Sequence, residues 1–233
     1  SLIYDAGHRR VSGVRVIDAN SFEALEFRSR IVFLCASALE STRILLNTTS
    51  SAYPGGLGSS SSELGHNLMD HSMGHGAVGT IPGYEDHVTY GNRPNGIYLV
   101  RFRNVKEKHP DFLRGYAFQG GGSRAGWGRG QSVKGFGAGF KQSLISERGP
   151  WQFSFYGFGE MLPRHENRIE LDPALKDRWG IPALRISCSY GPNEEAQWKD
   201  MISTATEMLE AAGATTIRPT NDDVKPGLGI HEM

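Results

Sequence analysis

The feature of this sequence that most constrains the fold is an apolar run that leads directly into a helical pattern. Residues 31–35 (Ile-Val-Phe-Leu-Cys) contain no charged or amide side chain, which is typical of a strand buried on both faces of a sheet. Leucine and isoleucine then recur at helical spacing in residues 39–47. We therefore expect a central strand at residues 31–35 and, after it, a helix that packs back on the sheet.

Three small residues, Ala36, Ser37 and Ala38, connect the expected strand to the expected helix. Ser37 is placed to act as the N-cap of this helix, and Glu40 completes the pattern of a capping box. A helix N-terminus attracts anions because it carries free backbone N–H groups and a partial positive charge. The turn is therefore predicted to contact an anion or a cofactor.

The segments around this run predict an antiparallel sheet and an irregular connection. Residues 2–4 and 11–17 alternate apolar and polar side chains about a turn at residues 5–8, as two paired strands do. Residues 24–30 form a third candidate strand. Residues 48–62 are rich in Ser, Gly and Pro, which favours a surface connection without regular structure.

A second antiparallel sheet is expected between residues 74 and 160, where glycine-rich turns separate short aromatic or β-branched runs. Glycine supplies 30 of the 233 residues, well above the usual share of about 7%. The candidate strands are residues 97–102, 114–118 and 151–158, followed by residues 169–171 and 184–190. These sheets and the helices together predict the α+β class.

One long amphipathic helix is expected at residues 193–212. Apolar side chains recur at steps of three and four residues, with Asn193 as the N-cap and Gly213 just after the end. The apolar stripe consists of Trp198, Met201, Ile202, Ala205, Met208, Leu209 and Ala212. Such a stripe predicts packing on a core rather than contact with a ligand.

Charge and cysteine content argue against several classes of function. The chain has 25 basic and 25 acidic residues, and a net charge of zero argues against broad attraction to nucleic acid or to anionic lipid. No apolar run approaches the roughly 20 residues that span a bilayer. Cys35 and Cys188 are far apart, so the chain has neither a Cys-x-x-Cys metal site nor a disulfide scaffold.

Asp70, His71 and His75 offer a carboxylate and two imidazoles, and the two histidines have the spacing of zinc ligands on a helix. Gly74 and Gly76 make a helix there unfavourable. We therefore expect no metal site, and we interpret Asp70 and His71 as a buried hydrogen-bonded pair.

Residues 120–130 alternate glycine with arginine and tryptophan, as do some proteins that bind single-stranded nucleic acid. Because the net charge is zero, we expect no nucleic-acid partner and favour a flexible loop over a substrate cavity. Trp127 in this loop either stacks on a sugar or another flat apolar face, or covers an edge of the core.

Glu160 ends an aromatic run and precedes Pro163. If its side chain is buried, it is a candidate catalytic acid or base. The alternative is an ion pair with a nearby arginine such as Arg164 or Arg168. The chain contains no Gly-x-Ser-x-Gly elbow, no P-loop and no complete dinucleotide fingerprint.

Three blocks of sequence, in one order, carry a resemblance to a known family. Residues 32–47 read VFLCASALESTRILLN and residues 64–71 read LGHNLMDH. Residues 159–163 read GEMLP, followed by LDP at 171–173 and DRWGIP at 177–182. These blocks resemble the glucose–methanol–choline (GMC) family of FAD-dependent oxidoreductases. In that family a strand ends at a small-residue turn against the flavin, and a G-x-N-L-x-D-H block and a substrate domain follow.

Two departures from the common family pattern narrow the resemblance. Where many members have Ser-Pro at the helix start this chain has Ser41-Thr42, and where they continue with Ser-Gly-Ile-Gly it has residues 48–51, Thr-Thr-Ser-Ser. The chain is in this respect similar to the bacterial branch of sugar and glycoside dehydrogenases and pyranose oxidases.

The resemblance implies a fragment of an enzyme that oxidises an alcohol group of a sugar or glycoside by hydride transfer to FAD. Residues 1–72 would belong to a partial, Rossmann-like FAD-binding domain, and residues 73–215 to an antiparallel-sheet substrate domain with helices on one face. Residues 216–233 would return to the FAD-binding domain. The dinucleotide fingerprint of the family is expected upstream of this sequence and its catalytic histidine downstream of Met233, so we expect the chain alone to be inactive.

The resemblance also implies roles for named residues and partners. Ala36, Ser37 and Ala38 would contact FAD through backbone groups, and Trp127 and Glu160 would line the substrate site. Expected partners are a sugar or other alcohol, the flanking segments of the same enzyme, and an electron acceptor or small subunit. The alternative is a non-catalytic carbohydrate-binding or assembly domain that retains the fold.

Overall fold

The computed structural model describes residues 1–87, 96–124, 126–221 and 226, without the side chain of Trp127, and it confirms the predicted α+β class. The chain divides into two compact units. Within the described ranges, the first unit holds residues 1–70, 162–189 and 226, and the second holds residues 71–161 and 190–221. The assignment of residues to a flavin and a substrate domain stays a prediction. In the described ranges, no helix is both long and apolar enough to cross a membrane.

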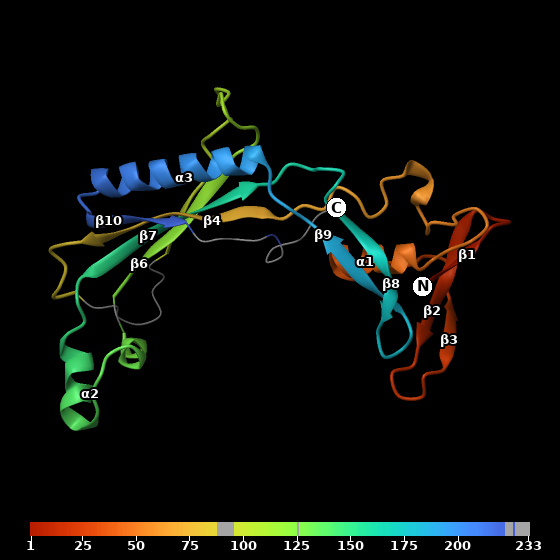
Figure 1. Cartoon of the computed structure of the whole chain (residues 1–233), viewed down its shortest axis with the longest axis horizontal. Coiled ribbons are helices and arrows are strands. Elements are labelled where there is room, and N and C mark those ends of the chain that lie inside the picture. Colours follow the sequence, from red (N-terminus) through yellow and green to blue (C-terminus); the bar gives the residue numbers. More distant parts are fainter. Residues whose placement is uncertain (88–95, 125, 222–225, 227–233) are drawn as a thin grey trace. The chain divides into compact units, whose positions relative to one another are not determined.

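The first unit contains a three-stranded antiparallel sheet, one α-helix and a hairpin (Figure 1). The sheet has the order β1 (Leu2–Asp5), β2 (Arg10–Ile17) and β3 (Ala24–Arg28). Helix α1 (Ser37–Leu46) and the short 3₁₀ helix η1 (Ser59–Ser61) follow, and β8 (Arg168–Lys176) pairs with β9 (Pro182–Ser187). The strands and the helix predicted for these segments are confirmed.

The predicted central strand at residues 31–35 is wrong. These residues form no strand, and the side chains of Ile31 and Phe33 are 69% and 84% exposed. A strand buried on both faces needs a neighbour on each side to complete its hydrogen bonds. In the described part of the first unit, β3 pairs with β2 and the β8–β9 hairpin pairs with itself, so no neighbouring strand is supplied.

Helix α1 packs against the β8–β9 hairpin rather than on a sheet that contains residues 31–35. Arg43 makes the connection: its Nε donates to the Pro182 carbonyl at 2.8 Å, and its Nη2 donates to the Asp177 carboxylate at 2.9 Å. The Nη2 atom also lies 3.2 Å from the Ile181 carbonyl. Charge-assisted hydrogen bonds of this kind are stronger than neutral ones, so they fix α1 to the turn of the hairpin.

The second unit is built on a five-stranded antiparallel sheet, as predicted for this part of the chain. The strand order is β10-β4-β7-β6-β5. Their bounds are β4 (His71–Ile81), β5 (Gly96–Leu99), β6 (Tyr116–Ser123), β7 (Trp151–Glu160) and β10 (Thr215–Asn221). Residues 120–123 therefore belong to β6 and are not part of a flexible loop. Gly120 is required there, because a Cβ atom would lie 2.0 Å from the Ser154 carbonyl oxygen.

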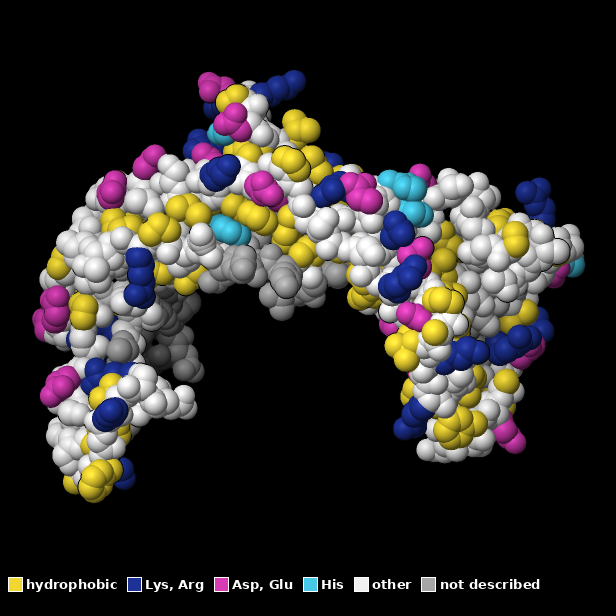
Figure 2. All heavy atoms as spheres, viewed as in Figure 1, with side chains coloured by type: hydrophobic (Ala, Val, Ile, Leu, Met, Phe, Trp, Pro, Cys, Tyr) yellow, Lys and Arg dark blue, Asp and Glu magenta, His cyan; other side chains and the backbone are white. Residues whose placement is uncertain are grey.

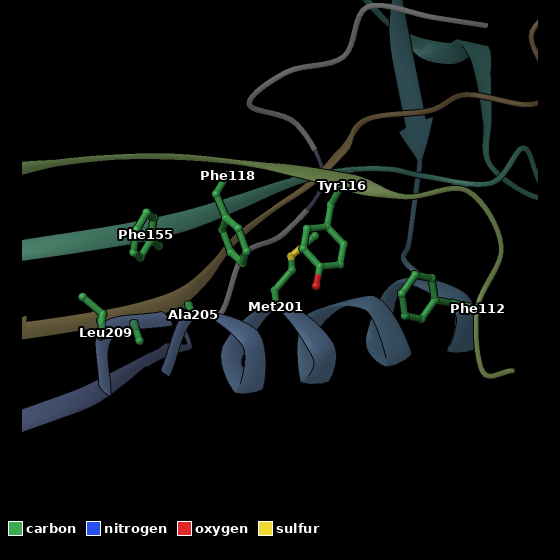
Figure 3. Packing of buried hydrophobic residues seen from close by; sticks show 8 residues of the cluster. Phe112, Tyr116, Phe118, Phe155, Met201, Ala205 and Leu209 are labelled. Atoms are coloured by element: carbon green, nitrogen blue, oxygen red, sulfur yellow. The ribbon is translucent and has the colours of Figure 1, made fainter. Parts of the chain in front are cut away.

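Helix α3 (Pro192–Ala211) covers one face of this sheet and forms the main core with it (Figures 1 and 3). The buried cluster consists of Ala77, Phe112, Tyr116, Phe118, Phe155, Met201, Ala205 and Leu209. The expected core role of the helix stripe is confirmed for the three helix residues of this cluster. Gly157 permits the close approach of helix and sheet, because its Cβ would lie 2.3 Å from the Met201 sulfur.

The predicted N-cap of α3, Asn193, is wrong by two residues. Gly191 is the N-cap, and Pro192 is the first helical residue. The buried Glu194 carboxylate accepts the Gly191 N–H at 2.7 Å, which is the acidic half of a capping box. Asn193 instead accepts the Leu113 N–H at 2.8 Å and so holds the chain before β6.

Two short helices that the sequence patterns did not predict follow β6. They are the 3₁₀ helix η2 (Trp127–Gln131) and helix α2 (Gly137–Ser146). Arg129 fixes them together, because its guanidinium donates to the Glu147 carbonyl and to the Ser143 carbonyl, the latter at 2.8 Å. Leu144 is the buried residue of α2.

Candidate functional site

The predicted cofactor turn forms a sharp bend at the start of α1. Ser37, the first helical residue, has φ of 61°, in the left-handed region that few residues other than glycine adopt. Ala36 is the N-cap, and no side chain caps the helix. The predicted capping box of Ser37 and Glu40 is therefore wrong. The Ala36 N–H donates to Ser41 Oγ at 3.3 Å instead, and Glu40 lies 3.4 Å from Arg43.

This bend has the properties of a surface that a flat or anionic group can approach closely. Ser37 is exposed, and Ala36 and Ala38 are half-buried with only methyl side chains. Because no described side chain caps the first turn, its N–H groups are available to a ligand.

The block at residues 64–70 has a scaffolding role within the first unit. A Cβ atom on Gly65 would lie 2.5 Å from the Ile169 carbonyl oxygen, so only glycine fits. The Ile169 N–H donates to the Gly65 carbonyl at 2.7 Å, and the Leu68 N–H donates to the Asn167 carbonyl at 3.0 Å. Leu68 is fully buried. These contacts fasten the block to the start of β8.

Asp70, His71 and His75 do not lie on a helix, because His71 begins strand β4. His75 is buried, and its ring stacks on Trp198 with centroids 4.4 Å apart. In the parts of the chain that the structure describes, no three His, Cys, Asp or Glu side chains are grouped so as to hold a metal ion. The hydrogen bond expected between Asp70 and His71 stays a prediction.

The face of the five-stranded sheet opposite α3 carries a row of polar and aromatic side chains. Side chains alternate along a strand, so Gln119 and Tyr156 face away from α3 while Phe118 and Phe155 face it. Tyr98 on β5 pairs with Gln119 on β6, which pairs with Tyr156 on β7. Tyr98 is 61% exposed and Gln119 is also exposed. The row offers two rings and an amide to a ligand.

Glu160 does not have the environment of a catalytic acid or base. Its side chain is 48% exposed and accepts a hydrogen bond from Arg101 Nη1 at 2.9 Å, with Arg114 3.8 Å away. The alternative of an ion pair is therefore correct, but the partners differ from those predicted. Arg164 and Arg168 pair with Glu166 and Glu170 instead.

The catalytic histidine expected downstream of Met233 is not among the residues that the structure places. Residues 227–233, Met233 included, lie outside the described part of the chain. The position of this histidine therefore stays a prediction. Glu160, the candidate within the described ranges, pairs with Arg101, and its predicted place in the substrate site stays a prediction.

Trp127 lies at the start of η2, after the end of β6. Its side chain lies outside the described part of the structure, so the predicted contact with a sugar stays a prediction. Arg124, from the same glycine-rich segment, donates to the carbonyls of Glu85, His87 and Gly149. This arginine therefore holds loops together.

A partly buried polar cluster, which the sequence patterns did not predict, fastens residues 101–110 to α3. Tyr116 donates to the Asp200 carboxylate, and Arg103 donates to both oxygens of that carboxylate at 2.8 and 3.0 Å. Burial and then the hydrogen bond to Asp200 raise the pKa of Tyr116, and the bond to Asp200 also raises the pKa of Arg103. Both groups keep their protons at neutral pH, so the cluster is a clamp. The sequence contained one sign of this cluster: Asp200 and Thr204 are four residues apart and therefore lie on the same face of the helix.

The chain is similar in sequence to a curated dehydrogenase. No family model matches the chain. The chain is 28% identical to a 2-methyl-1,2-propanediol dehydrogenase of Mycolicibacterium austroafricanum over 247 aligned positions. The alignment covers 96% of this chain and 41% of the relative, so the chain spans less than half of that protein's length.

Proposed function

We propose that this chain is part of an FAD-dependent oxidoreductase of the GMC family that oxidises a CH–OH group. The observation that carries the proposal is the uncapped, left-handed bend at Ala36–Ala38, which opens α1 with small side chains. The similarity to a dehydrogenase named for a branched diol supports alcohol oxidation in general. It is the blocks at residues 32–47 and 64–71 that suggest the GMC family and its flavin.

The residues of the bend fit a flavin nucleotide. Ala36, Ser37 and Ala38 would hold FAD through backbone groups, because their side chains are too small to keep a planar or phosphate-bearing group away. When bound, FAD supplies an acceptor for the hydride that leaves the alcohol carbon. Replacing one of these small side chains with a large one should therefore remove cofactor without removing the fold.

The row of Tyr98, Gln119 and Tyr156 is the proposed wall for the alcohol substrate. Tyrosine rings present flat apolar faces, and the hydroxyl and amide groups donate and accept hydrogen bonds with alcohol oxygens. In the proposed enzyme these side chains orient the substrate. Glu160 is not assigned to proton transfer in this proposal, because its side chain is 48% exposed and paired with Arg101.

The substrate class proposed is a molecule with several hydroxyl groups, from a small branched diol to a sugar. Gln119, which lies between Tyr98 and Tyr156, suits such a molecule. Its amide would form hydrogen bonds with neighbouring hydroxyl groups, and the tyrosine rings would cover the apolar carbons. Trp127 remains a proposed contact for a sugar ring. The proposed electron acceptor is oxygen, a quinone or a partner subunit, as in similar enzymes.

The test uses the protein produced from the complete reading frame that contains this chain. We expect it to be yellow with bound flavin and to reduce an artificial acceptor when given a panel of diols and sugars. Ala36→Leu should lower the flavin content at least tenfold, as measured by absorbance after heat release of the cofactor. The matched control is Ala24→Leu, at an exposed alanine in the same unit, which should keep its flavin.

A second variant separates the two parts of the proposal. Gln119→Ala should keep flavin but raise KM for the substrate about tenfold, which corresponds to the loss of one or two hydrogen bonds. Protein that binds sugar through this row but holds no flavin would favour the non-catalytic carbohydrate-binding domain instead. Protein with neither flavin nor alcohol oxidation would refute the proposed enzyme.

A further inference from the structure

We propose that residues 128–149, which we call the basic segment, dock this protein on an anionic lipid surface. The basic segment comprises most of η2, the loop after it, helix α2 and the three residues that follow. It combines a local excess of positive charge with exposed apolar side chains. This inference does not depend on the proposed oxidoreductase activity.

The charge of the basic segment is positive although the whole chain is neutral. The segment contains Arg129, Lys134, Lys141 and Arg148 against the single acid Glu147, which is a net charge of +3 from four minus one. None of these four basic side chains lies within ion-pair distance of a described acidic side chain. Arg129 donates to neutral carbonyl groups, which leaves its charge uncompensated. The segment therefore has a positive field of its own.

Exposed apolar side chains lie among these charges. Phe136 is 94% exposed and stands between Gly135 and Gly137, both with positive φ. Val133 and Ile145 are exposed as well, at 48% and 42%. Figure 2 shows hydrophobic and basic side chains next to one another over α2 and the loop before it. Exposure of this ring to water is unfavourable in free energy, and insertion of the ring into an apolar phase would remove that cost.

This combination favours a membrane surface over other occupants. Peripheral membrane segments bind by inserting aromatic and aliphatic side chains at the acyl boundary while lysine and arginine contact anionic headgroups. A symmetric contact between two copies would place +3 against +3, which opposes association. Single-stranded nucleic acid needs several stacking rings, whereas Phe136 is the one aromatic ring classed as exposed in the described part of the segment.

The test is sedimentation of the full chain with lipid vesicles. We expect binding to vesicles of phosphatidylcholine with phosphatidylserine, little binding to phosphatidylcholine alone, and a loss of binding as salt is raised. Replacing Lys134 and Lys141 together with glutamine should weaken binding about 25-fold, at about fivefold per charge. Phe136→Ala should weaken it about tenfold.

Matched variants show whether the effect belongs to this segment. Lys106→Gln with Lys108→Gln removes the same charge from another exposed loop of the second unit and should leave binding nearly unchanged. Leu113→Ala is the apolar control, at a side chain that is 63% exposed. Far-ultraviolet circular dichroism of each variant should match that of the parent, because all the changed side chains are exposed.

A reporter in the segment gives a second measurement that does not rely on loss of binding. Phe136→Trp should show a blue-shifted emission and quenching by brominated lipid on anionic vesicles, whereas Leu113→Trp should show neither. Three results would overturn the proposal: no binding to anionic vesicles, equal loss in the control variants, or self-association through Phe136 without lipid binding.

Discussion

The pKa of a single residue in this protein depends on groups that are distant in the sequence. Asp177 is an example, because its partner Arg43 lies 134 residues away on α1. The Asp177 carboxylate also accepts the N–H groups of Trp179 and Ile181 at 2.9 and 3.0 Å. Burial raises the pKa of Asp177, but these hydrogen bonds and Arg43 outweigh it and leave the pKa below the ordinary value of 3.8.

This shift predicts how stability depends on pH. The folded pKa of Asp177 lies below its unfolded value of 3.8, so the stabilising effect is present above that value and is lost as pH falls through the folded pKa. Asp177→Asn keeps an oxygen for the two backbone N–H groups but loses the charge that faces Arg43. We expect a lower urea midpoint than the parent at pH 7 and a smaller difference at about pH 3, because the carboxylate begins to lose its stabilising effect below 3.8.

Urea unfolding of both proteins at the two pH values checks this expectation. Asp111→Asn, at an exposed carboxylate, is the control and should change the midpoint little at either pH. A difference between Asp177→Asn and the parent that stays constant down to about pH 3 would show that the effect is not linked to protonation.

The residues of the candidate site show where sequence reasoning succeeds at this scale. The bend at Ala36–Ala38 could be placed from the sequence because small residues before a helical pattern are a local signal. The environment of Glu160 could not be predicted, because its partner Arg101 lies 59 residues away. Whether the two side chains meet depends on how the chain between them folds. The row of Tyr98, Gln119 and Tyr156 depends on strand register, which no local pattern encodes.

At the scale of elements, periodicity predicted most strands and helices, while their ends depended on tertiary partners. The stripe of α3 was correct because Met201, Ala205 and Leu209 face a sheet. The predicted start of the helix was wrong because Gly191 and Glu194 form the cap. Asn193 instead accepts the N–H of Leu113, a partner that is distant in the sequence. The run at residues 31–35 has the composition of a buried strand, but composition cannot supply the neighbouring strands.

The contact between α3 and the sheet gives a prediction for one element pair. Gly157→Ala should destabilise the protein by about 1–3 kcal/mol, because the new Cβ would overlap the Met201 sulfur. Met201→Ala alone should cost about 2–5 kcal/mol by leaving a cavity. In the double variant the added methyl group partly fills that cavity, so the double change should destabilise less than the sum of the two single changes.

Denaturant unfolding of the four proteins, treated as a double-mutant cycle, measures this coupling. Gly96→Ala serves as a control for the loss of a strand glycine, because its Cβ would meet only a carbonyl oxygen at 3.5 Å. Strictly additive effects of Gly157→Ala and Met201→Ala would mean that helix and sheet do not meet at this position.

At the scale of the whole molecule, the two units carry different parts of the proposed function. The bend and the uncovered run at residues 31–35 belong to the first unit, and the row of Tyr98, Gln119 and Tyr156 belongs to the second. We expect the 233-residue chain on its own to hold no stable FAD, because the described residues of the first unit provide no sheet beside that run.

Absorbance of the purified 233-residue chain after incubation with FAD and gel filtration measures this directly. The protein from the complete reading frame, prepared in parallel, is the control and should retain the cofactor. A yellow preparation of the 233-residue chain would contradict the expectation and show that the bend binds flavin without further sheet strands.

The exposed run at residues 31–35 also affects how readily the chain aggregates at high concentration. Residues 31–35 are β-prone, uncharged and free of proline, and β3 just before them is an edge strand among the described residues, with exposed Leu25 and Phe27. Such a stretch is a template for fibril-like stacking between molecules. Arg28 and Arg30, directly upstream, are the gatekeepers that oppose it. Replacing both arginines with uncharged residues would therefore lower the solubility of the protein and cause it to aggregate.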